Sequence, residues 1–265
     1  MMFFHILLWN ENENANRAFI EKGMHRMQKE NHNDMKRLTF GYLLEGEEKS
    51  ESQSGIFMKK NNEFIKIDEP YQSFFLMDFE DEDAYLRYIS SEAHDGPKAL
   101  HPKPGFAWEV CAKMWGKYLA TDFLYESAFP IVPKSIHGNK SIMHMVLWEM
   151  TNDVTENTVN EMFIALKDFN NTIPNISNIA FGRKFLGTSG SECLVHQNQL
   201  VERGTGPLPY EKINESPKFG LIVEFKDRID LDNYRNSQTH QEFVKKYVKP
   251  YWTKIYRHEL EINYG

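Results

Sequence analysis

Two pairs of side chains with the same spacing are candidates for proton-transfer chemistry. Tyr88 is followed six residues later by His94, and Tyr234 is followed six residues later by His240. A histidine with a pKa of about 6.5 accepts and returns a proton at neutral pH. A phenol donates a hydrogen bond to a carbonyl oxygen as it becomes an enolate, which lowers the barrier by ~3 kcal/mol. The pattern is therefore typical of acid/base catalysis next to a carbonyl group.

This spacing places a condition on the local structure. Six residues turn a regular helix through about 600°, so the two side chains of each pair lie on different faces. They converge only if the helix ends between them, and residues 90–92 and 236–238 are of types that are poor in helix interiors. The alternative interpretation is that each histidine only caps and packs the junction between helix and loop, without catalysis.

Two apolar segments each carry a histidine and, four residues later, a tryptophan. They contain His5 with Trp9 and His144 with Trp148. A histidine on an apolar strand is either a buried structural residue or part of a binding site, and a tryptophan there is more typical of core or rim packing. We include all four as candidate substrate-binding residues, with the structural interpretation as the alternative.

The sequence contains no pattern that would hold a metal or an organic cofactor. Neither His-x3-His nor His-Glu-x-x-His occurs, and Cys111 and Cys193 lack the CxxC spacing of thiolate zinc sites. The glycines within residues 187–190 and 204–207 do not lie between a strand and a helix, as a phosphate-binding loop requires. Two isolated cysteines indicate reduced thiols in a cytoplasmic protein.

Composition excludes several classes of function. The 265 residues carry a net charge of −7, whereas nucleic-acid binders need a basic face. No apolar run reaches the about 18 residues of a membrane span, and the first residues lack the basic leader of a signal peptide. We therefore expect a small-molecule substrate, and neither a nucleic-acid nor a membrane partner.

The two halves of the chain repeat the same features in the same order. His5 and His144 are 139 residues apart, and Tyr88 and Tyr234 are 146 residues apart. Three further matches lie between them: the Phe-Gly pairs at 40–41 and 181–182, hairpin-like segments at 55–67 and 192–203, and apolar segments at 74–80 and 220–226. We infer an internal duplication, with a first repeat at 1–127, a linker at 128–138 and a second repeat at 139–265.

Each repeat has the predicted element order β-α-β-β-α-β. The clearest helix is expected at 155–169, where apolar residues follow helical spacing after Thr155, a suitable N-cap. This order predicts an α+β fold, a ferredoxin-like sheet with helices on one face. Because the other face needs cover, we expect the two repeats to pack face to face as a barrel within one chain.

These motifs resemble the stress-responsive dimeric A/B barrel family. The second repeat has the whole pattern: the strand-one histidine, Ile173-Pro174 before Phe-Gly, the Val-Glu-Phe-Lys-Asp segment at 223–227 and Tyr-x5-His. The first repeat lacks the Ile-Pro signal. Members of this family are usually single domains that pair into a barrel, so the duplication implies an intramolecular pseudo-dimer, either as a monomer or within a further homodimer.

The resemblance also implies a chemistry. The family includes a plant polyketide cyclase and a plant hydroxynitrile lyase, which transfer protons next to a carbonyl without a metal or an organic cofactor. The cyclase acts through its Tyr-x5-His pair, which implies catalytic roles for both pairs named above. Its strand-one histidine matches His5 and His144 and implies that these residues line the barrel interior. A further histidine of the cyclase is replaced here by Ser73 and by Phe219, another candidate substrate-binding residue, which argues against the same substrate.

We therefore expect a cofactor-independent lyase, cyclase or isomerase that acts on a small carbonyl or polyketide-like compound, with the better-formed site in the second repeat. There His240 is expected to transfer the proton, Tyr234 to donate to the substrate oxygen and His144 to form the floor, so that the rate falls as the pH drops through the imidazole pKa. One alternative is a non-enzymatic stress-responsive or small-ligand-binding barrel. A weaker one is a haem-binding protein or cofactor-free monooxygenase on the same double-ferredoxin plan, with His258 or His137 as a haem ligand.

Overall fold

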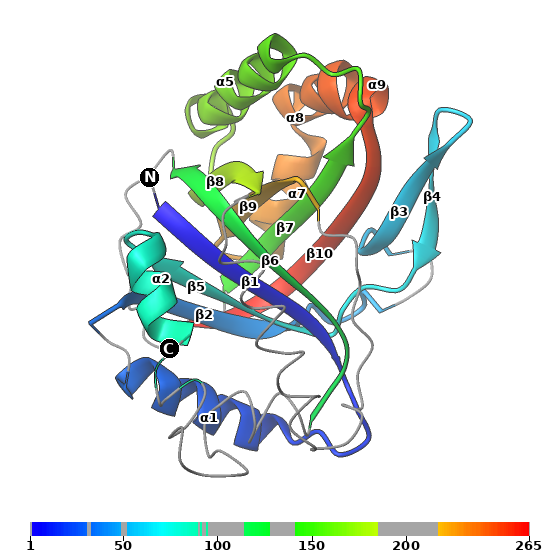
Figure 1. Ribbon diagram of the computed structural model, residues 1–265. Coiled ribbons are helices and arrows are strands. Elements are labelled where there is room, and N and C mark those ends of the chain that lie inside the picture. Colours follow the sequence, from blue (N-terminus) through cyan, green and yellow to red (C-terminus); the bar gives the residue numbers. More distant parts are fainter. Residues whose placement is uncertain are drawn as a thin grey trace.

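The computed structural model describes residues 2–30, 33–48, 52–89, 91, 94, 114–127, 141–184 and 217–264. These residues form two units with the same order of strands and helices (Figure 1). The first unit consists of β1 (Met2–Glu11), α1 (Arg17–Glu30), β2 (Met35–Leu43), β5 (Ser73–Phe79), α2 (Glu82–Ile89) and β6 (Trp115–Ser127). A hairpin of β3 (Gly55–Lys60) and β4 (Glu63–Asp68) is inserted between β2 and β5. The second unit consists of β7 (Ser141–Met150), α5 (Glu156–Thr172), β8 (Ile176–Lys184), β9 (Phe219–Phe225), α7 (Arg228–Asn236), α8 (Gln238–Phe243), a π-helical turn (Val244–Val248), α9 (Lys249–Tyr251) and β10 (Trp252–Tyr264).

Within each unit, four antiparallel strands form a ferredoxin-like sheet. Their order is β2-β5-β1-β6 in the first unit and β8-β9-β7-β10 in the second. Because β6 pairs with β8 and β2 pairs with β10, the two sheets join edge to edge into a closed barrel. The predicted fold, two ferredoxin-like repeats that form an intramolecular barrel, is confirmed. The limits 1–127, 128–138 and 139–265 stay a prediction, since the linker lies outside the described residues.

Each seam between the units is built on the Phe-Gly pair that marks the repeat. Gly41 of β2 faces β10, and Gly182 of β8 faces β6. A Cβ atom on either glycine would overlap a backbone carbonyl oxygen of the neighbouring strand, that of Glu261 or Leu124. Glycine is therefore required at the two places where the sheets close against each other.

Apolar side chains from both units fill the barrel interior. β1 contributes Phe4, Ile6 and Leu8, and β7 contributes three more fully buried residues, Met143, Met145 and Leu147. The alternate residues of the same strands face the helices that cover the outside of the barrel (Figure 1).

The strand-one histidines belong to this outer, helix-facing set. His5 lies 5.1 Å from the ring of Tyr85 on α2, and His144 lies 5.5 Å from the ring of Tyr234 on α7. The expectation that the two histidines line the barrel interior is therefore wrong. The period of two along a strand places them beneath the helices of their own repeats.

Two local sequence signals take the expected form. Asn61 and Asn62 both have positive φ, 52° and 65°, as a two-residue type I′ turn requires, and they join β3 to β4. Thr155 caps α5 by accepting a hydrogen bond from the Thr158 N–H at 3.2 Å. The second hairpin, expected at 192–203, lies outside the described residues.

A buried ionic cluster links the two units. The guanidinium of Arg37 on β2 lies 2.7 Å from Asp78 on β5 and 3.0 Å from Glu224 on β9. Asn178 on β8 donates a hydrogen bond to the same Glu224 carboxylate at 3.3 Å. Burial raises the pKa of Asp78 to about 6, although Arg37 opposes the shift. One cation thus holds together two buried carboxylates, one from each repeat.

Replacement of Arg37 by alanine is expected to lower the free energy of unfolding by about 3–5 kcal/mol, because Asp78 and Glu224 then remain buried without their cation. Urea denaturation followed by circular dichroism measures the change. Arg87→Ala is the matched control, since Arg87 pairs with Asp34 at an exposed site, where an ion pair contributes ~1 kcal/mol or less. Equal losses in the two variants would contradict the role assigned to the cluster.

Candidate functional site

The second Tyr-x5-His motif forms a corner between two helices. α7 ends at Asn236 and α8 begins at Gln238, with Ser237 between them. The Ser237 hydroxyl accepts a hydrogen bond from the His240 N–H at 3.2 Å and donates one to the Tyr234 carbonyl oxygen at 2.8 Å. The helix thus ends between the two residues, as their spacing requires, and the rings of Tyr234 and His240 lie 4.6 Å apart.

The first repeat folds its motif in a similar way. Ser91 accepts a hydrogen bond from the His94 N–H at 3.3 Å, and the rings of Tyr88 and His94 lie 5.0 Å apart. The Tyr88 hydroxyl, however, donates to the sulfur of Met27 on α1 at 3.0 Å. This phenol therefore has a partner within the core of its own repeat.

Each strand-one histidine is paired with a carboxylate that sequence reasoning missed. Nδ1 of His5 lies 2.6 Å from Asp122 on β6, and Nδ1 of His144 lies 2.8 Å from Glu259 on β10. Both carboxylates are buried, and each favours the tautomer with a proton on Nδ1. A signal for them was present in the sequence, because Asp122 and Glu259 recur 137 residues apart on the last strand of each repeat.

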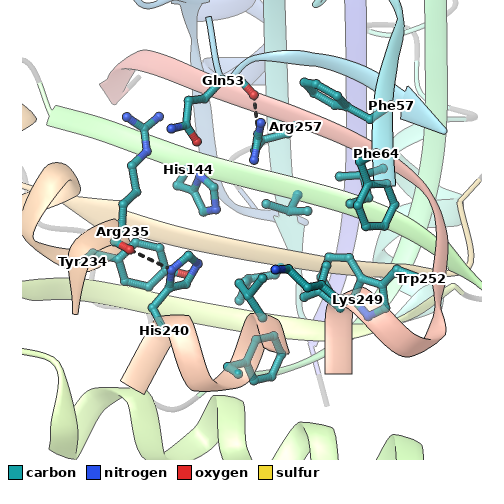
Figure 2. A pocket seen from close by; sticks show the side chains of 16 residues that line it. Gln53, Phe57, Phe64, His144, Tyr234, Arg235, His240, Lys249, Trp252 and Arg257 are labelled. Carbon is teal, nitrogen blue, oxygen red and sulfur yellow. Dashed lines mark hydrogen bonds between the residues drawn. The ribbon is translucent and has the colours of Figure 1, made fainter. Parts of the chain in front are cut away.

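A cavity of about 220 Å³ lies in the second repeat between the sheet and the helical segment 234–249 (Figure 2). His144, Tyr234 and His240 line one part of it. Phe57 and Phe64 of the β3–β4 hairpin line another part, so both repeats contribute to the site. The other apolar lining residues are Val146, Leu221, Phe243, Val244, Val248, Trp252 and Ile255. The volume of the cavity is below the about 300–1,000 Å³ of most ligand sites.

Glu259 is the centre of a charge network behind His144. It is fully buried, and the Arg235 guanidinium lies 2.5 Å from the same carboxylate oxygen that His144 contacts. Burial alone would raise the pKa of Glu259, but His144 and Arg235 outweigh burial and lower the pKa to about 2. The carboxylate is therefore charged, and it accepts a hydrogen bond from Nδ1 of His144.

The first repeat supports this network with a second carboxylate. Glu47 lies 3.0 Å from Arg228 and 4.0 Å from Arg235. It also accepts hydrogen bonds from the N–H and the hydroxyl of Ser54, at 3.1 and 2.9 Å. The Ser54 hydroxyl in turn accepts from the Glu259 N–H at 3.1 Å. Residues of the first repeat thus hold Arg235 and β10 in position.

The titratable groups at the Tyr-x5-His corner are both neutral at pH 7. Burial and the neighbouring His144 lower the pKa of His240 to about 4. Nδ1 of His240 donates to the Arg235 carbonyl oxygen at 3.1 Å, which makes Nε2 the acceptor nitrogen of the neutral ring. Burial and the Glu259 carboxylate raise the pKa of Tyr234 well above its ordinary value. The cavity therefore holds a neutral imidazole beside a neutral phenol.

The other candidate substrate-binding residues lie outside this cavity. Trp148 stacks on Phe219 and on Trp252, with ring centroids 5.6 and 4.2 Å apart, so it supports the cavity wall from behind. Trp9 is buried in the core of the first repeat, where His5 is also buried. Substrate-binding roles for these residues stay predictions.

Of the residues considered for haem or metal binding, the structure describes His258, which does not line the cavity. His258 is fully buried, its Nε2 accepts from the Tyr71 N–H at 3.0 Å, and burial lowers its pKa to about 3. His137, Cys111 and Cys193 lie outside the described residues. Within the described ranges, no cluster of three or more His, Cys, Asp or Glu side chains is arranged to hold a metal ion. No helix in the same ranges is long and apolar enough to cross a membrane.

Comparison with known proteins finds a family signal in the second repeat. Residues 204–262 match the family model described as Stress responsive A/B Barrel Domain, which confirms the resemblance inferred from the motifs. No protein with a curated description matches the chain in sequence.

Solved structures share the fold of the whole chain at low sequence identity. The chain is similar to a protein described as a putative monooxygenase from Lactobacillus acidophilus, with 11% identity and a TM-score of 0.56 over 100% of this chain and 95% of that one. It is similar to an anthrone oxidase-like protein with 8% identity and a TM-score of 0.56, over 99% and 91% of the two chains. The hydroxynitrile lyase from Passiflora edulis matches 47% of this chain with 94% of its own, at 16% identity and a TM-score of 0.34. At these identities the first two similarities show the fold alone.

The lowered pKa of His240 predicts a sensitivity to acid. The unfolded chain has a histidine pKa of about 6.5, so the folded state binds fewer protons between that value and about 4. Stability therefore falls as the pH drops through this window, by on the order of 3 kcal/mol from this ring. Urea denaturation at the two ends of the window measures the loss. His240→Gln is expected to lose less stability than the unsubstituted protein, and an equal loss would show that His240 titrates normally.

Proposed function

We propose that the chain is a cofactor-independent acid/base enzyme, a lyase, cyclase or isomerase, that transfers a proton next to the carbonyl group of a small compound. One observation supports this most strongly. His144, Tyr234 and His240 converge on one cavity, and the buried Glu259 carboxylate lies directly behind His144. Enolate formation needs a base, a hydrogen-bond donor for the oxygen and an apolar enclosure, and this cavity has a candidate for each.

His144 is the better proton acceptor of the two histidines. Because its Nδ1 is paired with Glu259, its Nε2 carries the lone pair, and the carboxylate stabilises the imidazolium that forms. His240 instead donates to a backbone carbonyl, and burial lowers its pKa to about 4, which makes it a weak base. This order of roles differs from the one expected from the sequence, in which His240 accepts the proton and His144 forms the floor.

Tyr234 then acts on the substrate oxygen. As the C–H bond breaks, the proton moves to Nε2 of His144 and the electron pair moves toward the carbonyl oxygen, to which the Tyr234 hydroxyl donates. Burial and Glu259 raise the pKa of Tyr234, so the phenol keeps its proton and remains a donor. Return of the proton to a different carbon completes an isomerisation. Loss of a leaving group gives a lyase, and attack on a second carbonyl gives a cyclase.

A cofactor-free monooxygenase is the second candidate. Its first step is the same, because a deprotonated carbon next to a carbonyl is also the species that would react with oxygen. The likeness over the whole chain to the monooxygenase and anthrone oxidase-like structures favours it. Oxygen consumption during turnover, measured with an electrode, separates it from a lyase, cyclase or isomerase, which consume no oxygen.

His144→Gln is expected to lower the rate of proton exchange by ~10²–10⁴-fold, since it removes the base. Tyr234→Phe is expected to lower it by ~10²–10³-fold, since it removes one donor. Exchange of the hydrogens next to the carbonyl of small ketones such as 4-phenylbutan-2-one in D₂O, followed by NMR, measures these rates without knowledge of the natural substrate. His94→Gln is expected to have a smaller effect than His240→Gln, because the described cavity lies in the second repeat.

Arg183→Met is the control for these variants, since Arg183 pairs with Glu156 at an exposed site away from the cavity. Circular dichroism verifies that each variant is folded. An unchanged rate in His144→Gln would exclude His144 as the base. If no ketone in the panel exchanges faster than in buffer, the alternative of a small-ligand-binding barrel is favoured.

A further inference from the structure

The cavity wall has an uneven distribution of charge. Among its lining residues, Arg235, Lys249 and Arg257 are cationic and none is a carboxylate. Arg235 is balanced by Glu259, 2.5 Å away. Arg257 and Lys249 form no ion pair with a carboxylate of the described part of the chain. The carboxylates of Glu259 and Glu47 act on Arg257 through space, but neither lines the cavity, so the groups that face an occupant are cationic.

Arg257 is held in a defined position on this wall. Its Nε donates to the Gln53 carbonyl oxygen, and its guanidinium lies 4.7 Å from the centre of the Phe57 ring. Both partners come from the first repeat, so the segment that leads into the β3–β4 hairpin anchors the side chain. The terminal nitrogens of the guanidinium can then form two parallel hydrogen bonds to one anion.

Arg257 also lies next to the proposed proton-transfer residues. β10 directs Arg257 and Glu259 to the same helix-facing side, because alternate residues of a strand share a face. Two residues span about 7 Å along a strand, and Glu259 contacts His144. If one end of a ligand binds Arg257, the neighbouring atoms of that ligand therefore lie beside His144 (Figure 2). Burial lowers the pKa of Arg257, since its charge is poorly solvated, and a bound anion would offset that cost.

We propose that the cavity binds an organic carboxylate with an aryl or alkyl body, with its carboxylate on Arg257 and its body against Phe57, Phe64 and Trp252. If the proposed function also holds, on which this step rests, the substrate is a keto acid whose carbonyl lies between the carboxylate and the apolar body. A guanidinium matches a carboxylate through two charge-assisted hydrogen bonds, whereas a neutral amide cannot form both.

Isothermal titration calorimetry of the full chain with 4-phenylbutanoate and 4-phenylbutanamide tests this proposal, because the two probes differ only in the charged group. At neutral pH the acid is expected to bind on the order of 10- to 100-fold more tightly than the amide. Arg257→Met is expected to abolish this preference, and Arg257→Lys to keep part of it. Arg183→Met, an exposed arginine on β8, is expected to keep all of it.

Equal affinity for the acid and the amide, no binding of the acid, or a preference that survives in Arg257→Met would overturn the proposal. The ratio of two affinities within one variant does not depend on the fraction of folded protein. Ketone exchange then distinguishes the two proposals. A preference for the acid that depends on Arg257, without exchange that depends on His144, retains the carboxylate site and removes the enzyme. Exchange that depends on His144, without a preference for the acid, supports the enzyme and rejects the carboxylate site.

Discussion

A ferredoxin-like sheet with helices on one face has a second apolar face that must be covered, and in this chain each repeat covers the other. The closed interior that results is filled by side chains such as Leu8 and Met145. Because strand residues alternate between faces, closure directs the strand-one histidines outward, beneath the helices. The cavity therefore forms between sheet and helices, and the hairpin inserted in the first repeat reaches across the seam to complete its wall.

The two repeats share a histidine–carboxylate pair but differ in the cations around it. The Tyr-x5-His motifs are 146 residues apart, so the position of Arg235 corresponds to Ile89. The carboxylates Asp122 and Glu259 are 137 residues apart, so the position of Arg257 corresponds to Ala120. Among the described residues, a cation pairs with the buried carboxylate in the second repeat, where Arg235 contacts Glu259, and none does so with Asp122 in the first. Burial of a charge is costly unless a partner of opposite sign is close, so Arg235 offsets a cost of burying Glu259 that the residue type at position 89 cannot offset.

The features that depend on local pattern were predictable from the sequence, and those that depend on pairing between distant strands were not. Periodicity and the repeated motifs predict the duplication, the barrel and the helix end at Ser237, because each rests on neighbouring residues or on self-similarity. The partnership of His144 with Glu259 depends on the register of β7 against β10, and the direction of His5 depends on which face of β1 becomes the interior. The low pKa of His240 was also out of reach, because it arises from burial beside His144.

The glycine-lined seams have a consequence for the synthesis of the protein. Gly41 on β2 finds its partner Ile262 on β10 only after 221 further residues have been made. At about 5–20 residues per second, β2 keeps an open edge for on the order of ten seconds or more, and an open edge is a template for pairing with another chain. Barrel closure is thus a late, long-range event, and contacts of this kind fold slowly. Until β10 has been made, the unpaired edge of β2 in the nascent first repeat is therefore available for aggregation.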